Sequence, residues 1–321
     1  MPDRTLPFRS EDALWQELTR HWPVCQGNVV VGVGDDCAVL RGDSPAHHVL
    51  FKTDIVVQDA HFTAATPPRL VGRKALCRAV SDIAAMGGRP GAALVTLGLP
   101  RPGGGDSALP SPSSAASAKF FSANYLRAVY QGLKDAAAEC GVSLAGGETS
   151  RARQFFLNIA LLGETRGYTP VLRSTARPGD LIWVTGRLGN TQKRRHLTFT
   201  PRLAEGQFLA AESFATAMMD ISDGLGRDLP RLARASRLGC SLHYATIPRN
   251  RGADLRAAMS DGEDFELLFT TAIDRADELR RRWHFPCSIT CIGQMSAKHT
   301  GRRAWSPPEN WIDGYDHLKQ P

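Results

Sequence analysis

Long apolar runs are absent from the 321-residue sequence: nothing approaches the roughly 18 consecutive apolar residues that indicate a membrane-spanning helix. The N-terminal segment MPDRTLPFRSEDALWQELTRHW is charged and lacks the apolar core of a secretory signal. None of the seven cysteines forms a C-x-x-C pair. We therefore expect a cytoplasmic protein with reduced, mostly buried thiols, without structural zinc and without a membrane partner.

Several catalytic signatures are also missing. The chain contains no G-x-x-x-x-G-K-[ST] segment, which excludes a P-loop enzyme, and no H-R-D with a D-F-G, which excludes a protein kinase. No Ser/His/Asp or Cys/His order suggests acyl transfer. The chemistry must therefore come from other residue types.

The charge balance is basic but dispersed. Lysine and arginine number 39 against 32 acidic residues, a formal net charge of +7. The only tight basic clusters, residues 193–196 and 280–282, are not interleaved with aromatic residues. This pattern does not meet the criterion for a nucleic-acid stripe, so we expect no nucleic-acid partner, and it suits an anionic small substrate.

Apolar periodicity predicts strands alternating with helices in both halves of the chain. A Gly/Pro/Ser-rich segment at residues 101–119 predicts a surface loop, and a break in the pattern falls at residues 173–180. We therefore predict a mixed α/β fold of two domains, residues 1–170 and residues 171–321. The expected helices are 11–22, 69–86, 122–140 and one after residue 222, and the expected strands are 29–33, 48–57, 92–99, 155–165, 181–186, one within 262–270 and one within 287–295.

Carboxylates follow glycines or interrupt apolar segments at many points along the sequence. Each has an ordinary structural explanation: Asp223 could cap a helix, Asp35 or Asp36 could form an Asx-turn, and Asp82 could pair with Arg78 four residues earlier. Together they fit a different explanation better, because several acids in one cleft repel one another unless a hard divalent cation such as Mg²⁺ binds them. The residues concerned are Asp35, Asp36, Asp54, Asp82, Glu148, Asp220, Asp223, Glu263 and Asp264.

The segments that carry these acids, taken in order, resemble the thiamine-monophosphate kinase family, within the superfamily that also holds aminoimidazole ribonucleotide synthetase. The resemblance runs from about residue 28 to residue 318. It rests on GVGDDCAVL, KTDIVVQDAHF, RKALCRAVSDIAAMGGRPGAALVTLGLP, AGGETS, VLRSTARPGDLIWVTGRLG, FTPRLAEGQFLA, MMDISDGLGRDLPRLARAS, GEDFELLFT, CIGQM and GYDHL.

The resemblance implies a PurM-like architecture in which the N-terminal domain has a mixed sheet and forms a homodimer. It implies ATP-dependent phosphorylation of thiamine monophosphate to thiamine diphosphate with several Mg²⁺ ions, by direct in-line transfer without a protein nucleophile. Its implied metal ligands are Asp36, Thr53, Asp54, Asp82, Glu148, Asp220 and Asp223. Its implied ATP contacts are Gly147, Glu148, Arg173 and Ser222, and its implied substrate contacts are His61, Glu263 and Tyr315.

Several positions depart from the family pattern, and four of them bear on the site: Lys52, Glu148, Asn190 and Asp261. A lysine at position 52 could replace the charge of a metal ion, contact a phosphate or point to solvent. These departures identify a divergent member and leave two alternatives open. One is an enzyme of the same superfamily with another phosphate or carboxylate substrate, and the other is a weakly active nucleotide-binding paralogue. Of the adjacent pair, Asp36 is the expected direct ligand and Asp35 the residue that supports the turn.

Overall fold

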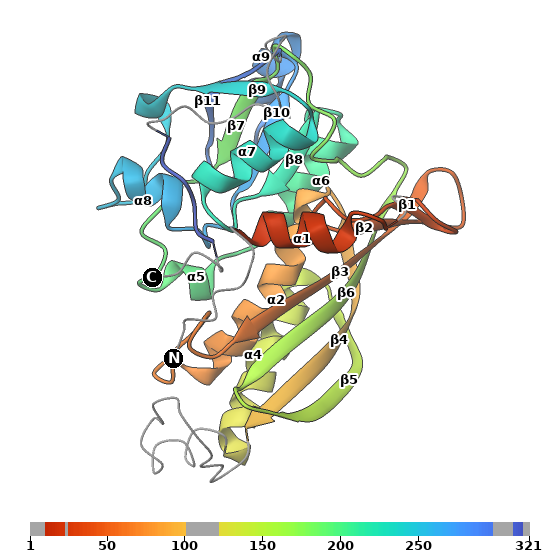
Figure 1. Cartoon of the computed structure of the whole chain (residues 1–321), viewed down its shortest axis with the longest axis vertical. Coiled ribbons are helices and arrows are strands. Elements are labelled where there is room, and N and C mark those ends of the chain that lie inside the picture. The colour runs from red at the N-terminus through yellow and green to blue at the C-terminus, as the bar shows by residue number, and fades with distance from the viewer. Residues whose placement is uncertain (1–9, 23–24, 101–121, 298–310, 317–321) are drawn as a thin grey trace.

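The computed structural model describes residues 10–22, 25–100, 122–297 and 311–316 (Figure 1). The loop predicted at residues 101–119 and the last residues of the C-terminal motif lie outside the described residues. Within them the fold is mixed α/β, as predicted, and contains two separate sheets. No helix among these residues is long and apolar enough to span a membrane.

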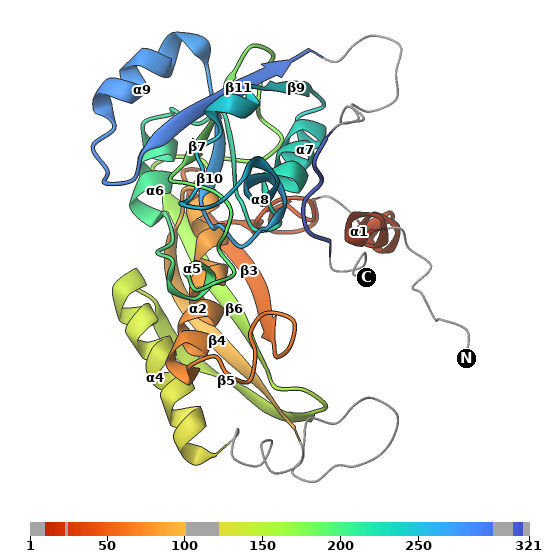
Figure 2. The ribbon, with the colours of Figure 1, turned by 90° about the vertical axis from the view of Figure 1, so that its left-hand side faces the viewer.

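The first sheet has six strands in the order β1-β2-β3-β6-β4-β5. Every neighbouring pair is antiparallel except β4 and β5, so the sheet is mixed, as expected. Helices α2 and α4 cover one face, as Figure 2 shows. The bounds are β1 (Val29–Val31), β2 (Ala38–Arg41), β3 (His47–Val57), α2 (Pro68–Ala85), β4 (Arg89–Pro100), α4 (Ala123–Cys140), β5 (Ser143–Ala152) and β6 (Phe156–Arg166).

Strand β3 shows how this sheet presents its two faces. Leu50 and Val56 are buried on the side of α2, whereas Phe51 and Ile55 are exposed on the opposite side. Because side chains alternate along a strand, the residues between Leu50 and Val56 at even positions also face α2. Lys52 and Asp54 therefore lie on the side of the sheet that α2 covers.

Helix α2 begins and ends where the sequence indicates. Pro68 occupies its first turn, where the absent N–H costs nothing, and Gly87 adopts a left-handed φ of 70° just after its end. It packs against α4 with their backbones in contact. A Cβ at Gly72 would lie 2.0 Å from the Val129 carbonyl oxygen, and a Cβ at Gly132 1.9 Å from the Arg69 carbonyl oxygen. Only glycine fits at either position.

The second sheet has five strands in the order β8-β10-β7-β11-β9, all antiparallel. One apolar core lies between this sheet and helices α7 and α8, and another lies between the sheet and helices α6 and α9. The bounds are β7 (Leu181–Thr185), α5 (Arg195–Thr198), α6 (Leu203–Ala211), β8 (Ala217–Asp220), α7 (Leu225–Ala235), β9 (Gly239–Leu242), α8 (Leu255–Ser260), β10 (Leu267–Thr271), α9 (Ala276–Arg282) and β11 (Ile289–Ser296).

Helix α2 connects the two layers of the molecule. Helix α2 also contacts α6 and β8, so the end of its sequence lies between the two sheets. Helix α1 (Glu11–Thr19) is attached to α7 of the second unit, because Asp12 accepts hydrogen bonds from Arg231 at 2.8 and 3.1 Å. The strands of the first sheet end at Arg166 and those of the second begin at Leu181, and the division at residue 170 stays a prediction.

Candidate active site

Three predicted metal ligands meet where the two sheets adjoin. Asp36 lies in the turn between β1 and β2, Asp82 in the last turns of α2, and Asp220 at the end of β8. All three are buried, and a carboxylate oxygen from each lies within 4.8 Å of the others. Residues up to 184 positions apart in the sequence meet in this cluster, because α2 reaches from the first sheet to the second.

Each of these carboxylates has a different neighbour. Asp36 accepts hydrogen bonds from the Arg173 guanidinium, Asp82 forms an ion pair with Lys52 at 3.0 Å, and Asp220 accepts the Ser81 hydroxyl hydrogen bond at 2.6 Å. Burial, followed by the charge of Asp36, raises the pKa of Asp220 to about 7. Burial also raises the pKa of Asp82 well above its usual value. Three closely spaced carboxylates thus share two cationic partners.

This donor set fits a hard divalent cation. Carboxylate oxygens are the ligands that Mg²⁺ prefers, and the raised pKa values of Asp82 and Asp220 reflect the cost of burying carboxylates close to one another. Asp35 has the supporting role expected of it: one carboxylate oxygen accepts the Asp36 N–H at 3.1 Å, and the other accepts the Arg173 N–H at 3.1 Å. Burial and the Asp36 charge raise the pKa of Asp35 to about 7.

A second charged group lies beside the first and centres on Glu263. Its carboxylate contacts Lys74 Nζ at 2.6 Å, His196 Nδ1 at 2.9 Å and Arg78 at 3.7 Å. Burial acts to raise the pKa of Glu263, but the His196 hydrogen bond and the charges of Lys74 and Arg78 outweigh it and lower the pKa to about 2. Glu263 is therefore ionised at neutral pH.

The cations of this second group join other predicted residues to it. Lys74 is fully buried, and its Nζ also donates a hydrogen bond to the His61 carbonyl oxygen at 2.6 Å. The Lys74 ammonium therefore contacts both His61 and Glu263. Arg78 Nε donates to Asp54 at 3.2 Å. Burial lowers the pKa of Lys74 to about 8, with the Glu263 charge opposing the shift. Sequence reasoning missed Lys74 and His196, whose only signal was a charged residue inside an otherwise apolar helix and a histidine within a basic cluster.

Backbone hydrogen bonds hold the other predicted residues of the C-terminal half, Ser222, Asp223 and Tyr315, near Glu263. The Glu263 N–H donates to the Ser222 carbonyl oxygen at 2.7 Å, and the Tyr315 N–H donates to the Asp223 carbonyl oxygen at 2.8 Å. The Asp223 carboxylate contacts Arg231 at 2.6 Å. Glu263 takes a left-handed φ of 53°, a strained conformation that is characteristic of functional turns.

Three predicted site residues, Thr53, Gly147 and Glu148, contact neither the carboxylate cluster nor the Glu263 group. The Thr53 hydroxyl lies on the open face of β3 and donates to the Asn158 side chain at 3.0 Å. Gly147 and Glu148 are exposed on edge strand β5, and strands β6 and β4 lie between β5 and β3. Their assignments as metal or ATP contacts stay predictions.

Two of the ordinary structural explanations are wrong. Arg78 does not pair with Asp82, because it turns toward Asp54 and Glu263 while Lys52 takes Asp82. Asp223 does not cap α7, whose N-cap is Gly224. The buried Asp228 carboxylate instead accepts the N–H groups of Ser222 and Asp223, at 3.0 and 2.9 Å.

The departures from the family pattern also have partners. The Asn190 N–H donates to the Asp261 carboxylate at 2.7 Å, so two of the four unusual residues contact each other. Lys52 does not point to solvent, because its ammonium contacts Asp82. Glu148 accepts a hydrogen bond from the N–H of the next residue, Thr149, at 2.8 Å.

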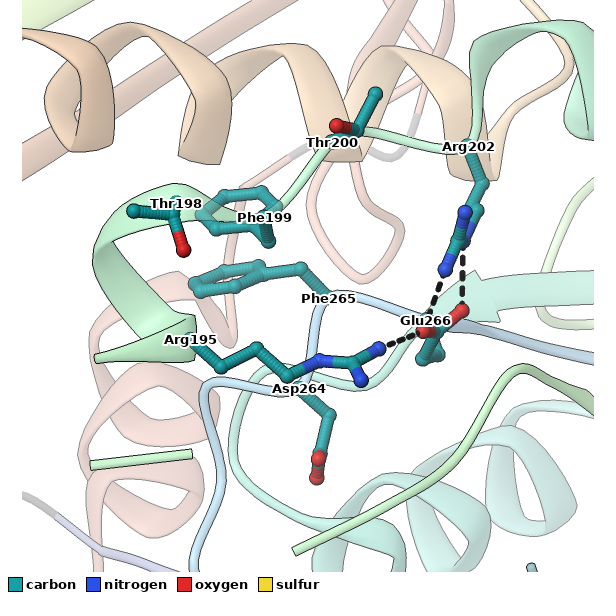
Figure 3. Close-up of a pocket in the computed structure, with 8 residues that line it drawn as sticks. All are labelled: Arg195, Thr198, Phe199, Thr200, Arg202, Asp264, Phe265 and Glu266. Carbon is teal, nitrogen blue, oxygen red and sulfur yellow. Dashed lines mark hydrogen bonds and ion pairs between the residues drawn. The ribbon is translucent and has the colours of Figure 1, made fainter. Parts of the chain in front are cut away.

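A cavity of about 200 Å³ lies apart from the carboxylate cluster (Figure 3). Arg195 and Arg202 both point at Glu266 there, and Arg202 does so through two hydrogen bonds of 2.7 Å. Glu266 also accepts the Thr185 hydroxyl hydrogen bond at 2.7 Å. Phe199 and Phe265 stack above, with ring centroids 4.0 Å apart. The charges of Arg195, Arg202 and Glu266 are paired with one another, which indicates a structural role for these three residues.

Comparisons with known proteins find relatives over most of the chain. A family model described as AIR synthase related protein, N-terminal domain, matches residues 34–165. The chain is 34% identical over 286 residues to the thiamine-monophosphate kinase of Rhodopirellula baltica, covering 83% of this chain and 84% of the relative. It is 31% identical over 328 residues to that of Escherichia coli (strain K12), covering 92% and 94%.

Solved structures agree with the sequences. AaThiL, complexed with AMPPCP and TMP, superposes with a TM-score of 0.73 at 26% identity, covering 90% of this chain and 91% of that one. The fold is thus the two-sheet, PurM-like fold that the sequence indicated. Since relatives above 30% identity match well over two thirds of its length, the chain belongs to the thiamine-monophosphate kinase family.

Proposed function

We propose that the chain transfers a phosphoryl group from ATP to thiamine monophosphate and so forms thiamine diphosphate. The observation that carries this proposal is the buried Asp36–Asp82–Asp220 cluster at the junction of the two sheets, in a chain whose relatives are named thiamine-monophosphate kinases. The AaThiL complex with AMPPCP and TMP supports a nucleotide and TMP as the two ligands of this fold.

Mg²⁺ is the proposed metal, and the three clustered carboxylates are its proposed central ligands. Asp54 and Asp223 lie around them, each already facing an arginine, while Thr53 and Glu148 are the outermost members of the proposed set. When bound, Mg²⁺ would supply the positive charge that offsets the negative charge of the phosphoryl group during transfer.

The chain's own residues then supply binding and orientation. Arg173 already faces the cluster through Asp36, which supports its proposed contact with the ATP phosphates, together with Gly147, Glu148 and Ser222. His61, Glu263 and Tyr315 are the proposed substrate contacts, and Lys74 holds the first two of these together. No protein nucleophile is needed, because the phosphate of the substrate attacks ATP directly.

We also propose two domains, residues 1–170 and 171–321, and a homodimer formed through the first sheet. The open face of that sheet carries a set of exposed apolar side chains that no described helix covers: Phe51, Ile55, Leu94 and Leu162. Phe51 pairs directly with Leu162 across β3 and β6, and Leu94 of β4 pairs with Ala160, two residues before Leu162 on the same face of β6.

The direct test is to incubate the purified protein with thiamine monophosphate, ATP and Mg²⁺ and to quantify thiamine diphosphate by chromatography, with an EDTA control. Metal-dependent product is expected. Asp36→Asn should reduce turnover on the order of 100-fold while the circular dichroism spectrum is unchanged. The matched control is Asp277→Asn, an aspartate 81% exposed on α9, which should leave turnover unchanged.

Other outcomes are equally specific. Absence of product with ATP still bound by calorimetry would favour another substrate within the superfamily or a non-catalytic paralogue. Unchanged turnover in Asp36→Asn would overturn the assignment of the cluster as the metal site.

A further inference from the structure

Lys52 is the one lysine that contacts a carboxylate of the cluster among the described residues. It occupies the α2-facing side of β3, between buried Leu50 and the partly buried Asp54, and a quarter of its side chain is exposed. Its ammonium nitrogen lies 3.0 Å from Asp82 Oδ2. Of the three roles open to a lysine here, pointing to solvent is therefore excluded.

The surroundings of Lys52 are strongly acidic. The ammonium contacts Asp82, whose carboxylate lies within 4.8 Å of those of Asp36 and Asp220. Asp54 lies two residues further along β3, on the same side of the strand. Lys52 thus places a positive charge beside the carboxylate cluster.

The position of this charge matters for metal binding. An ammonium 3.0 Å from Asp82 Oδ2 is within hydrogen-bond distance of an oxygen that could otherwise bind a metal ion. It also repels any divalent ion bound at the same carboxylate. A carboxylate shared between an ammonium and a metal therefore holds fewer or weaker metal ions than a free one.

We propose that Lys52 is a resident cation of the Asp36–Asp82–Asp220 cluster that takes the place of one divalent ion, so that the chain binds one Mg²⁺ fewer than these carboxylates would otherwise hold. This inference rests on the proposed function for its choice of metal. It identifies Lys52 as a positioning residue that sets metal stoichiometry and orients Asp82.

Binding of Mn²⁺ alone tests the proposal without any kinase assay. The free Mn²⁺ signal in electron paramagnetic resonance is measured while the full chain, without nucleotide, is titrated at pH 7.5. Lys52→Met removes the charge and keeps most of the length, and Lys52→Ser does so with a smaller side chain in case the methionine variant does not fold. Lys52→Arg keeps the charge, and Lys134→Met on the exposed side of α4 is the matched control.

Lys52→Met and Lys52→Ser should each bind one more Mn²⁺ per chain than the unaltered protein, with at least tenfold tighter binding at the first site. Lys52→Arg and Lys134→Met should bind as the unaltered protein does. In a chelator, Lys52→Met should melt at a lower temperature than the unaltered protein, and Mn²⁺ should raise its melting temperature more.

Equal stoichiometry and affinities within twofold for the unaltered protein and both neutral variants would overturn the proposal, and so would the absence of Mn²⁺ binding in all of them. The kinase assay and the Mn²⁺ titration test separate claims, so either can give a negative result without the other. An extra Mn²⁺ in the neutral variants, in a chain that forms no thiamine diphosphate, would refute the proposed function and leave the role of Lys52 intact.

Discussion

Single charged residues in this site are held by partners from distant parts of the chain. Asp36 pairs with Arg173, which lies 137 residues away, and Glu263 with Lys74 and Arg78 of α2. Breaking one member of such a buried pair leaves an uncompensated charge, which costs more than the pair itself contributes. The individual acids therefore matter to stability as well as to the proposed chemistry.

The acid dependence of stability tests this at Glu263, whose pKa of about 2 lies below its usual 4.5. A carboxyl with a lowered folded-state pKa stabilises the fold above the ordinary pKa, and this contribution is lost as pH falls from 4.5 toward 2. Glu263→Gln should lower the free energy of unfolding at pH 7 by about 3 kcal/mol. The difference between the two proteins should shrink below pH 4.5, as measured by urea denaturation at each pH.

The control for this experiment is Glu139→Gln, because Glu139 also pairs with an arginine, Arg73, but is 55% exposed. Its substitution should change the free energy of unfolding by less than about 1 kcal/mol at every pH. A pH-independent difference between Glu263→Gln and the unaltered protein would contradict the ionised state assigned to Glu263.

The sequence allowed the carboxylates of the site to be predicted but not their cations. Asp36, Asp82 and Asp220 could be identified because the acids that follow glycines or interrupt apolar segments are explained better together than one at a time. Lysines and arginines are common and evenly distributed in this chain, so that, apart from Lys52 and Arg173, which the family resemblance singled out, the paired cations could not be identified. The local rule that pairs residues four apart on a helix gave the wrong partner for Arg78, because tertiary contacts with Asp54 and Glu263 prevail.

Among the elements, α2 carries the largest share of the site. It contributes Asp82 to the cluster, Lys74 and Arg78 to the Glu263 group, and Ser81 to Asp220. Its extent was predictable from apolar periodicity and the glycines after its end, whereas its backbone contact with α4 was not. Close approach of two helices depends on where glycines from separate segments meet in space.

Gly132→Ala on α4 tests the importance of that contact. The added Cβ would lie 1.9 Å from the Arg69 carbonyl oxygen, so α2 must move away from α4. We expect a loss of about 1–3 kcal/mol in the free energy of unfolding, typical of overpacking, together with reduced turnover because α2 positions the charged groups. Lys134→Ala, two residues away on the exposed side, should leave both quantities within error. Equal melting temperatures for Gly132→Ala and the unaltered protein would show that α2 accommodates the methyl group.

For the whole molecule, the two faces of the first sheet have unlike surroundings. One face packs on α2 and α4, and the other exposes Phe51, Leu94 and Leu162 at 47%, 50% and 42% of their surface. Such side chains in one patch on a sheet are typical of a protein interface. The patch was not predictable from the sequence, because an apolar residue in a strand looks the same whichever face it occupies.

If the patch is the proposed dimer interface, a charge at its centre must separate the two copies. Leu94→Glu should elute in size-exclusion chromatography with light scattering at the chain mass of 34.9 kDa, whereas the unaltered protein should have twice that mass. A buried carboxylate without a partner costs several kcal/mol, enough to dissociate an interface of moderate affinity. Leu18→Glu on α1, where the leucine is similarly exposed at 56%, should remain dimeric and shows whether any added surface charge has this effect. A dimer that survives Leu94→Glu, or an unaltered protein of single-chain mass, would place the interface elsewhere or remove it.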